Sequence, residues 1–176
     1  MTVSPTLSKT QYIKGLQCPK ALWYYKNRKD LKPVIDAATQ AKFDMGNDIG
    51  ALAQHYFDNG IEVKNKYWDI KGAITTTEKY INEGYEVIYE ATAMHQGHGG
   101  YSRIDILKKD SETDEWDLIE VKSSTSVKDY HIDDLSFQYH VFHNAGYKIR
   151  RCFLMYINNQ YRRDGEIEPK KLLQLE

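Results

Sequence analysis

The chain has 176 residues, of which 41% are hydrophobic and 28% are charged. This length and composition indicate an ordinary globular protein with a single domain over residues 1–176, large enough to form a core without a disulfide framework. The net charge of −1 argues against a surface coated in basic residues. No apolar run approaches membrane-spanning length, and the N-terminal segment MTVSPTLSKT lacks the apolar core of a signal peptide. We therefore expect a cytoplasmic protein.

The first predicted helix covers residues 6–27 and opens at Ser8. Pro19 interrupts its apolar stripe and is expected to start a second helical segment, because proline is tolerated in a first helical turn. Cys18 and the distant Cys152 match neither a disulfide framework nor a complete zinc site, so reduced thiols are expected. Basic residues form two sets, and each set is either a positively charged stripe that binds nucleic acid or a solvated face. The N-terminal set is Lys9, Lys14, Lys20, Lys26, Arg28, Lys29 and Lys32, and the C-terminal set is Lys148, Arg150, Arg151, Arg162 and Arg163.

A longer amphipathic pattern predicts a helix over residues 36–59, with His55 on its surface. A short strand over 61–63, a helix over 73–82 and a strand over 85–93 follow. In MHQGHGGY, His95 and His98 have no third ligand at metal-site spacing, so we interpret this segment as a loop.

Residues 101–125, YSRIDILKKDSETDEWDLIEVKSST, are the most informative stretch. Two apolar runs, 102–107 and 116–121, flank a polar segment and predict a β-hairpin. Since residues two apart on a strand share a face, Ile104 and Ile106 are expected to point the same way.

The hairpin register decides where its charges lie. If Ile106 lies beside Ile119, Asp105 faces Glu120 with Cβ atoms roughly 5 Å apart, and Lys122 projects beside them. Two opposed carboxylates are destabilising unless something offsets them, and a hard divalent cation is one solution. The alternative is an exposed hairpin edge with mixed charges.

With RIDIL and IEVKSS, this stretch resembles the PD-(D/E)XK nuclease superfamily, in its RecB-like branch. The resemblance implies that Asp105 and Glu120 bind Mg²⁺ or Mn²⁺, that the carbonyl of Val121 completes the metal shell, and that Lys122 is catalytic and orients the attacking water. Relatives often carry a glutamate at the position of Glu90, near the metal or its waters; a structural salt bridge is the alternative.

The N-terminal phrase LSKTQYIKGLQCPKALWY is similar to the opening of RecB-like proteins related to CRISPR-associated exonucleases. In those proteins the cysteine binds a four-iron cluster with three downstream partners that have no match here. We therefore expect no iron-sulfur cluster in this chain alone. Cys18 is either a ligand that needs a longer parent protein or a small buried residue, and Cys152 is expected to be inert packing. The segment GNDIG places Gly50 where the family has a histidine.

A helix is predicted over 133–145, ended by Gly146. Its Gln138 matches the first position of the family's Q-x-x-x-Y motif, which implies that it steadies the substrate, whereas Phe142 replaces the tyrosine. A strand is predicted over 147–158. The end, RRDGEIEPKKLLQLE, does not read as a completed element, and its final Leu-Glu pair resembles a vector-derived tail on a nuclease domain taken from a longer protein.

These elements predict a mixed α/β fold of the α+β type, with a central sheet of about four or five strands and helices on both faces. The resemblance implies a restriction-endonuclease-like architecture and a Mg²⁺- or Mn²⁺-dependent deoxyribonuclease acting in DNA processing or repair on single-stranded DNA or a duplex end, with exonuclease action favoured. The competing hypothesis is a catalytically inactive module that has kept this fold and binds nucleic acid or a protein. Gly50 and Phe142 favour the inactive module; Asp105, Glu120 and Lys122 favour the enzyme.

Overall fold

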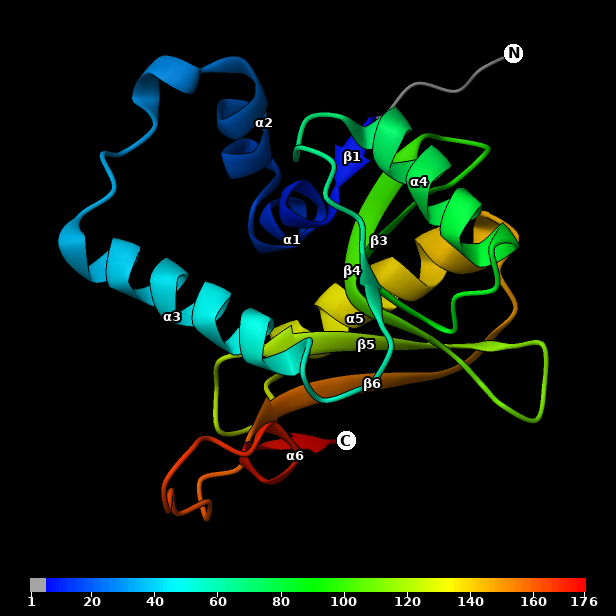
Figure 1. Cartoon of the computed structure of the whole chain (residues 1–176). Helices are drawn as coiled ribbons and strands as arrows, with labels where there is room; N and C mark the ends of the chain where they lie inside the picture. Colours follow the sequence, from blue (N-terminus) through cyan, green and yellow to red (C-terminus); the bar gives the residue numbers. More distant parts are fainter. Residues whose placement is uncertain (1–5) are drawn as a thin grey trace.

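The computed structural model describes residues 6–176, which fold around a curled, mixed, seven-stranded sheet (Figure 1). The strand order is β2-β3-β4-β5-β6-β7, and β1 pairs with β4 beside this path. The strands are β1 (Leu7–Ser8), β2 (Ile61–Glu62), β3 (Val87–Met94), β4 (Gly100–Lys109), β5 (Trp116–Lys122), β6 (Ile149–Ile157) and β7 (Leu173–Leu175). The helices are α1 (Lys9–Gln17), α2 (Pro19–Asn27), α3 (Ala37–Ala53), α4 (Ile70–Asn82), α5 (Asp129–Asn144) and α6 (Pro169–Leu172), with a 3₁₀ turn at Lys29–Leu31.

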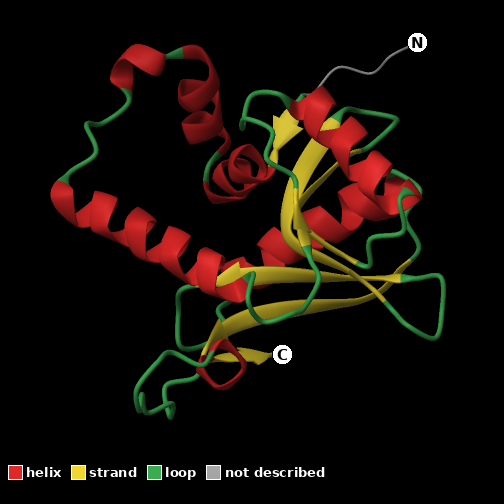
Figure 2. Ribbon diagram, viewed as in Figure 1, coloured by secondary structure: helices red, strands yellow, loops and turns green. Residues whose placement is uncertain are grey.

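The mixed α and β architecture is confirmed, with helices on both faces of the sheet (Figure 2). On one face, side chains of α1, α4 and α5 pack on the sheet in a first core cluster. On the other face, α3, α6 and β7 close a second cluster. All five predicted strands are present, and the prediction missed β1 and β7.

The central hairpin has the predicted register, since Ile106 pairs with Ile119. The predicted shared face of Ile104 and Ile106 is wrong, because Ile104 belongs to the first core cluster and Ile106 to the second. On the paired strand β3, Glu90 has a φ of 58° between Tyr89 and Ala91, which also belong to different clusters. A positive φ in a strand turns the chain locally, so the buried face of the β3–β4 pair reverses at Glu90.

Local sequence signals explain where several helices begin and end. Ser8 caps α1 through a capping box with Gln11, and Pro19 opens α2 at the expected break. After α5 the chain turns at Gly146, whose φ of 99° suits glycine. Helix α5 is the crossover connection between the adjacent parallel strands β5 and β6.

Several predicted boundaries need correction. The helix predicted over 73–82 begins earlier, at Ile70. The helix predicted over 36–59 ends at Ala53, so His55 lies exposed in the turn that follows rather than on a helix. The helix predicted from residue 133 begins at Asp129. The C-terminal segment does complete an element: Leu173 is buried, Leu175 pairs with Met155 of β6, and the backbone of Glu176 bonds that of Leu154. Across residues 6–176 no helix has both the length and the apolar character needed to cross a membrane.

Candidate functional site

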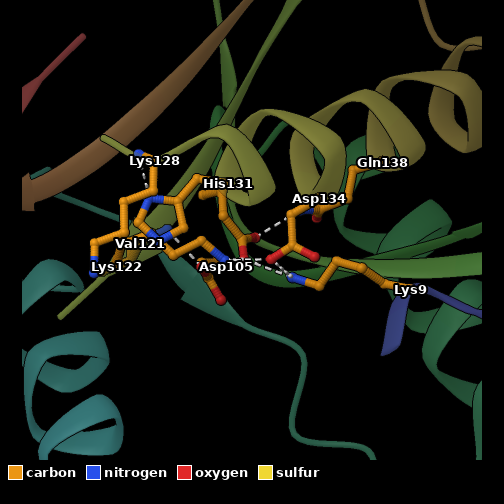
Figure 3. Close-up of polar contacts among 9 residues, drawn as sticks. Lys9, Asp105, Val121, Lys122, Lys128, His131, Asp134 and Gln138 are labelled. Carbon is orange, nitrogen blue, oxygen red and sulfur yellow. Dashed lines mark hydrogen bonds and ion pairs between the residues drawn. The ribbon is translucent and has the colours of Figure 1, made fainter. Parts of the chain in front are cut away.

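Four elements bring charged side chains together beside the central hairpin (Figure 3). Strand β4 carries Asp105, and β5 carries Glu120 and Lys122. Helix α5 contributes Asp134 and Gln138, and the first residue of α1, Lys9, arrives from the far end of the sequence. The predicted residues Asp105, Glu120, Lys122 and Gln138 therefore share one site.

Glu120 is the centre of this site and is only 3% exposed. Its Oε1 accepts hydrogen bonds from Nζ of Lys9 at 2.5 Å and Nζ of Lys122 at 2.8 Å. Its Oε2 accepts a hydrogen bond from Nε2 of Gln138 at 2.7 Å. Burial alone would raise the pKa of Glu120, but the two ammonium groups outweigh it and lower this pKa to about 2. Glu120 is therefore an anion throughout the neutral range.

Asp105 has the opposite electrostatic behaviour. Its Oδ2 accepts a hydrogen bond from the backbone N–H of Val121 at 2.6 Å, which fixes the carboxyl against β5. Burial, and after it the negative charge of Glu120, raise the pKa of Asp105 well above its ordinary value. The two neighbouring acids therefore have pKa values displaced in opposite directions, as coupled carboxyls do.

Lys122 is held between two carboxylates. Its Nζ donates to Glu120 and to Oδ2 of Asp134, the latter at 2.5 Å. Burial alone would lower the pKa of Lys122, but the charge of Glu120 and the contact with Asp134 raise it overall. Lys122 is therefore a permanent cation that orients and stabilises negative charge, and it cannot serve as a base near neutral pH.

The site has an unfilled acceptor on its α5 side. Gln138 is fully buried, and its Oε1 has no hydrogen-bond partner among the described residues. A buried amide oxygen without a partner costs free energy, which a bound water or ion would recover. The carboxyl oxygens of Asp105 and Glu120 are of the type that Mg²⁺ and Mn²⁺ prefer. Both oxygens of Glu120 already accept hydrogen bonds, from Lys9, Lys122 and Gln138, so an ion would have to displace some of these donors.

Glu90 lies at the edge of the site. Burial raises its pKa, and its charge interacts with those of Arg103, Glu120 and Lys9. Its Oε2 lies 3.9 Å from Nε of Arg103, so the salt bridge considered for it is present, although it is long. The positive φ of Glu90 places this acid at the point where the sheet reverses its faces.

Sequence reasoning missed Lys9, Asp134 and His131 as members of the site. Lys9 is 111 residues from Glu120, and no local pattern signals that contact. Asp134 and the buried His131 precede Gln138 by four and seven residues, so all three occupy one face of α5. This helical spacing was the available signal for Asp134 and His131.

Several other sequence interpretations change with the structure. Cys18 is exposed, so its interpretation as a small buried residue is wrong. It caps the break between α1 and α2, where its backbone is extended and no core surrounds it. Cys152 is partly buried in β6, and burial raises its thiol pKa to about 11, as expected of an unreactive packed cysteine.

The two basic sets are not uniformly free surface. Lys9 belongs to the carboxylate site. Arg150 pairs through Nε with Asp117 at 3.0 Å and also contacts Asp110, so it braces the β4–β5 turn.

A scan against protein-family models found no match for the chain, and a search of curated proteins found no significant match.

Proposed function

We propose that this protein is a metal-dependent nuclease that hydrolyses phosphodiester bonds of DNA. The single observation that carries the proposal is the convergence of Asp105, Glu120, Lys122 and Gln138, from two adjacent strands and a helix, on one site. The same four residues occupy the motif positions by which the sequence resembles the PD-(D/E)XK superfamily. A restriction-endonuclease-like arrangement of the sheet is part of this proposal.

In this proposal Asp105, Glu120 and the carbonyl of Val121 hold Mg²⁺ or Mn²⁺, with Glu90 contributing directly or through water. The bound ion supplies Lewis-acid activation of water and charge neutralisation at the phosphate. A cation favours the ionised form of Asp105, whose pKa is raised, so ion binding is expected to strengthen as pH rises and to release a proton wherever this carboxyl is protonated.

The remaining residues position the reactants. Lys122, held by Glu120 and Asp134, directs a fixed positive charge at the phosphate and orients the attacking water. Gln138 holds Glu120 through its amide N–H and offers its unpartnered oxygen to a water or to the substrate side. His131 has a pKa lowered by burial and by the charge of Lys122, so its ring adds no further positive charge at neutral pH.

Helix α2, which follows α1 in the chain, offers an exposed surface suited to the proposed DNA substrate. Helix α2 exposes Trp23 and Tyr24 next to basic side chains, and the Nζ of Lys20 lies 6.0 Å from the centre of the Tyr24 ring. Exposed aromatic rings interleaved with lysines bind single strands by stacking and phosphate attraction. This helix follows directly on α1, which delivers Lys9 to the site.

One observation favours the second candidate, an inactive nuclease-fold module. Lys9 donates to the same Glu120 oxygen as Lys122, and thus places an ammonium group where a cation would approach. In such a module Lys9 would neutralise the site permanently and the fold would only bind DNA or a protein.

Cleavage assays distinguish the two candidates. Single-stranded and duplex DNA are incubated with Mn²⁺, Mg²⁺ or EDTA, using the wild type, Lys122→Ala, Asp105→Asn and the control Lys42→Ala on exposed α3. A nuclease gives metal-dependent cleavage that falls about 10²-fold or more in the two site variants and is unchanged in the control. Binding without cleavage supports the inactive module, and cleavage that survives EDTA or both site variants rejects this site.

A further inference from the structure

Three histidines gather at a place separate from the carboxylate site. His95 and His98 lie in the turn between β3 and β4, and His140 lies on α5. One ring nitrogen from each lies within 4.8 Å of the other two, and this is the one such trio of potential ligands among residues 6–176. The sequence interpretation of His95 and His98 as part of a loop is confirmed, whereas the expected lack of a third ligand is corrected, since α5 supplies His140 from a distant part of the chain.

The turn that carries two of these rings is well fixed. The N–H of His95 donates to the carbonyl of Gly100 at 2.7 Å, and the N–H of Gly99 donates to the carbonyl of His95 at 3.0 Å. From the N-terminal segment, the hydroxyl of Thr6 donates to the carbonyl of His98 at 2.6 Å. The backbone that positions the rings is therefore set before any ligand arrives.

The distances between the rings suit a metal ion. Nε2 of His98 lies 3.3 Å from Nε2 of His140. Two nitrogens bound tetrahedrally to zinc at about 2.0–2.1 Å are separated by about 3.3–3.4 Å, so this pair already has the required spacing. The ring of His95 stacks on that of His98 with centroids 3.7 Å apart, and one nitrogen of each of the three rings lies within 4.8 Å of the others, so the three nitrogens must move closer together to bind one ion.

We propose that His95, His98 and His140 form a binding site for a divalent transition-metal ion of the Zn²⁺ class. The donor set contains three imidazoles and no carboxylate, which favours Zn²⁺, Ni²⁺ or Cu²⁺ over Mg²⁺ or Ca²⁺. Three protein ligands leave a fourth position for water or a further ligand. Gln138 and His140 are two residues apart on α5, which is a rotation of about 200° around the helix axis, so they lie on nearly opposite sides of the helix. The ion is therefore held away from the carboxylates.

Binding rearranges the protons of the cluster. Nδ1 of His98 accepts the N–H of Gly100 at 3.1 Å, so the neutral ring carries its proton on Nε2 and presents it to His140. An ion that takes this Nε2 position requires the proton to move to Nδ1, and Gly100 then loses its acceptor. Because His98 and His140 are exposed, their rings can reorient with little loss of packing.

The test is a titration of protein without a polyhistidine tag by Zn²⁺, with saturating Mg²⁺ present and a chromogenic chelator as competitor. The wild type is expected to bind one Zn²⁺, and His140→Ala and His98→Ala are each expected to weaken this binding at least tenfold. His143→Ala, one turn along the same exposed helix surface and outside the trio, is the matched control. Asp105→Asn should also keep the wild-type Zn²⁺ affinity.

Thermal unfolding gives a second readout, since an ion that binds the folded state raises the midpoint. Zn²⁺ should raise the midpoint of the wild type and of His143→Ala, and should not raise that of His140→Ala. Equal Zn²⁺ affinity in wild type, His140→Ala and His98→Ala would overturn the proposal. A Zn²⁺ site that disappears in Asp105→Asn would do so as well, because the ion would then sit on the carboxylates.

Discussion

At the scale of single residues, Asp105 and Glu120 are adjacent acids whose pKa values are displaced in opposite directions. The difference follows from their partners, since Glu120 receives two ammonium groups and Asp105 receives one backbone N–H. The sequence predicted that the two acids face each other. It could not predict which acid would have the raised pKa, because that depends on Lys9, 111 residues from Glu120.

We predict a stability maximum in the acidic range for the protein in EDTA. The pKa of Glu120 is lowered from 4.5 to about 2, so its contribution is complete above pH 4.5 and is lost as pH falls toward 2. The pKa of Asp105 is raised from 3.8, so its contribution is complete below pH 3.8 and is lost as pH rises through the raised value. Thermal unfolding midpoints measured over a range of pH test both the loss of stability toward low pH and the loss toward high pH.

Asp105→Asn provides the control for that profile. An amide cannot ionise, so the variant should lose the decline on the alkaline side and keep the decline on the acid side. Mn²⁺ should restore stability to the wild type at higher pH and leave the variant nearly unchanged. An alkaline decline of equal size in both proteins would show that Asp105 does not cause it.

Lys9→Met tests whether the second lysine competes with a metal ion. Removing a positive charge next to Glu120 lowers the repulsion of an incoming cation, so Mn²⁺ affinity should rise about tenfold or more. Calorimetric titration of both proteins measures this change, with Lys14→Met on α1 as the control. If Lys9→Met binds Mn²⁺ no more tightly than the wild type, Lys9 does not occupy the ion's place.

At the scale of elements, α5 joins the core to the site. Phe137, Val141 and Phe142 face the first core cluster, while Asp134 and Gln138 reach the carboxylates. The helix itself and its end at Gly146 were predictable from local pattern and turn chemistry. Its start at Asp129 was not, because the polar run SSTSVKDYHIDD contains several equivalent helix-start signals.

Phe142→Tyr, which restores the tyrosine of the resembled motif, should not restore any substrate contact. Phe142 is completely buried and its ring packs on Tyr147 at a centroid distance of 5.1 Å. An added hydroxyl without a partner there should cost about 1–3 kcal/mol of unfolding free energy. Chemical denaturation and the cleavage assay measure the two effects, with the exposed Tyr139→Phe on the same helix as control. Increased cleavage by Phe142→Tyr would contradict this placement.

At the scale of the whole molecule, long-range pairing completes the sheet. The alternating patterns of β3, β4 and β5 and the strongly apolar centre of β6, CFLMYI, were strong enough to predict all four central strands. Strand β7 was not predictable, because three residues carry no periodic signal and their pairing with β6 is a tertiary contact. The reversal of faces at Glu90 was likewise hidden, since it depends on a backbone dihedral angle rather than on residue type.

The contribution of β7 is measurable with two leucines of the same strand. Leu173 is 2% exposed in the second core cluster, whereas Leu175 is 37% exposed. Leu173→Ala should lower the unfolding free energy by about 2–5 kcal/mol, as expected for truncating a buried leucine. Leu175→Ala should cost well under half of that in the same denaturation experiment. Equal effects would mean that β7 adds only backbone pairing to the edge of the sheet.

The pairing of Leu7 with Gly100 has a consequence for the order of events during synthesis. The segment that carries Leu7 and Lys9 leaves the ribosome long before its partner strand and Glu120 do, so Lys9 reaches Glu120 only at a late, non-local folding step. Until then the nascent chain carries an incomplete charge cluster. A rigid fusion partner placed directly before residue 6 would slow this docking step and leave the cluster without one of its two lysines.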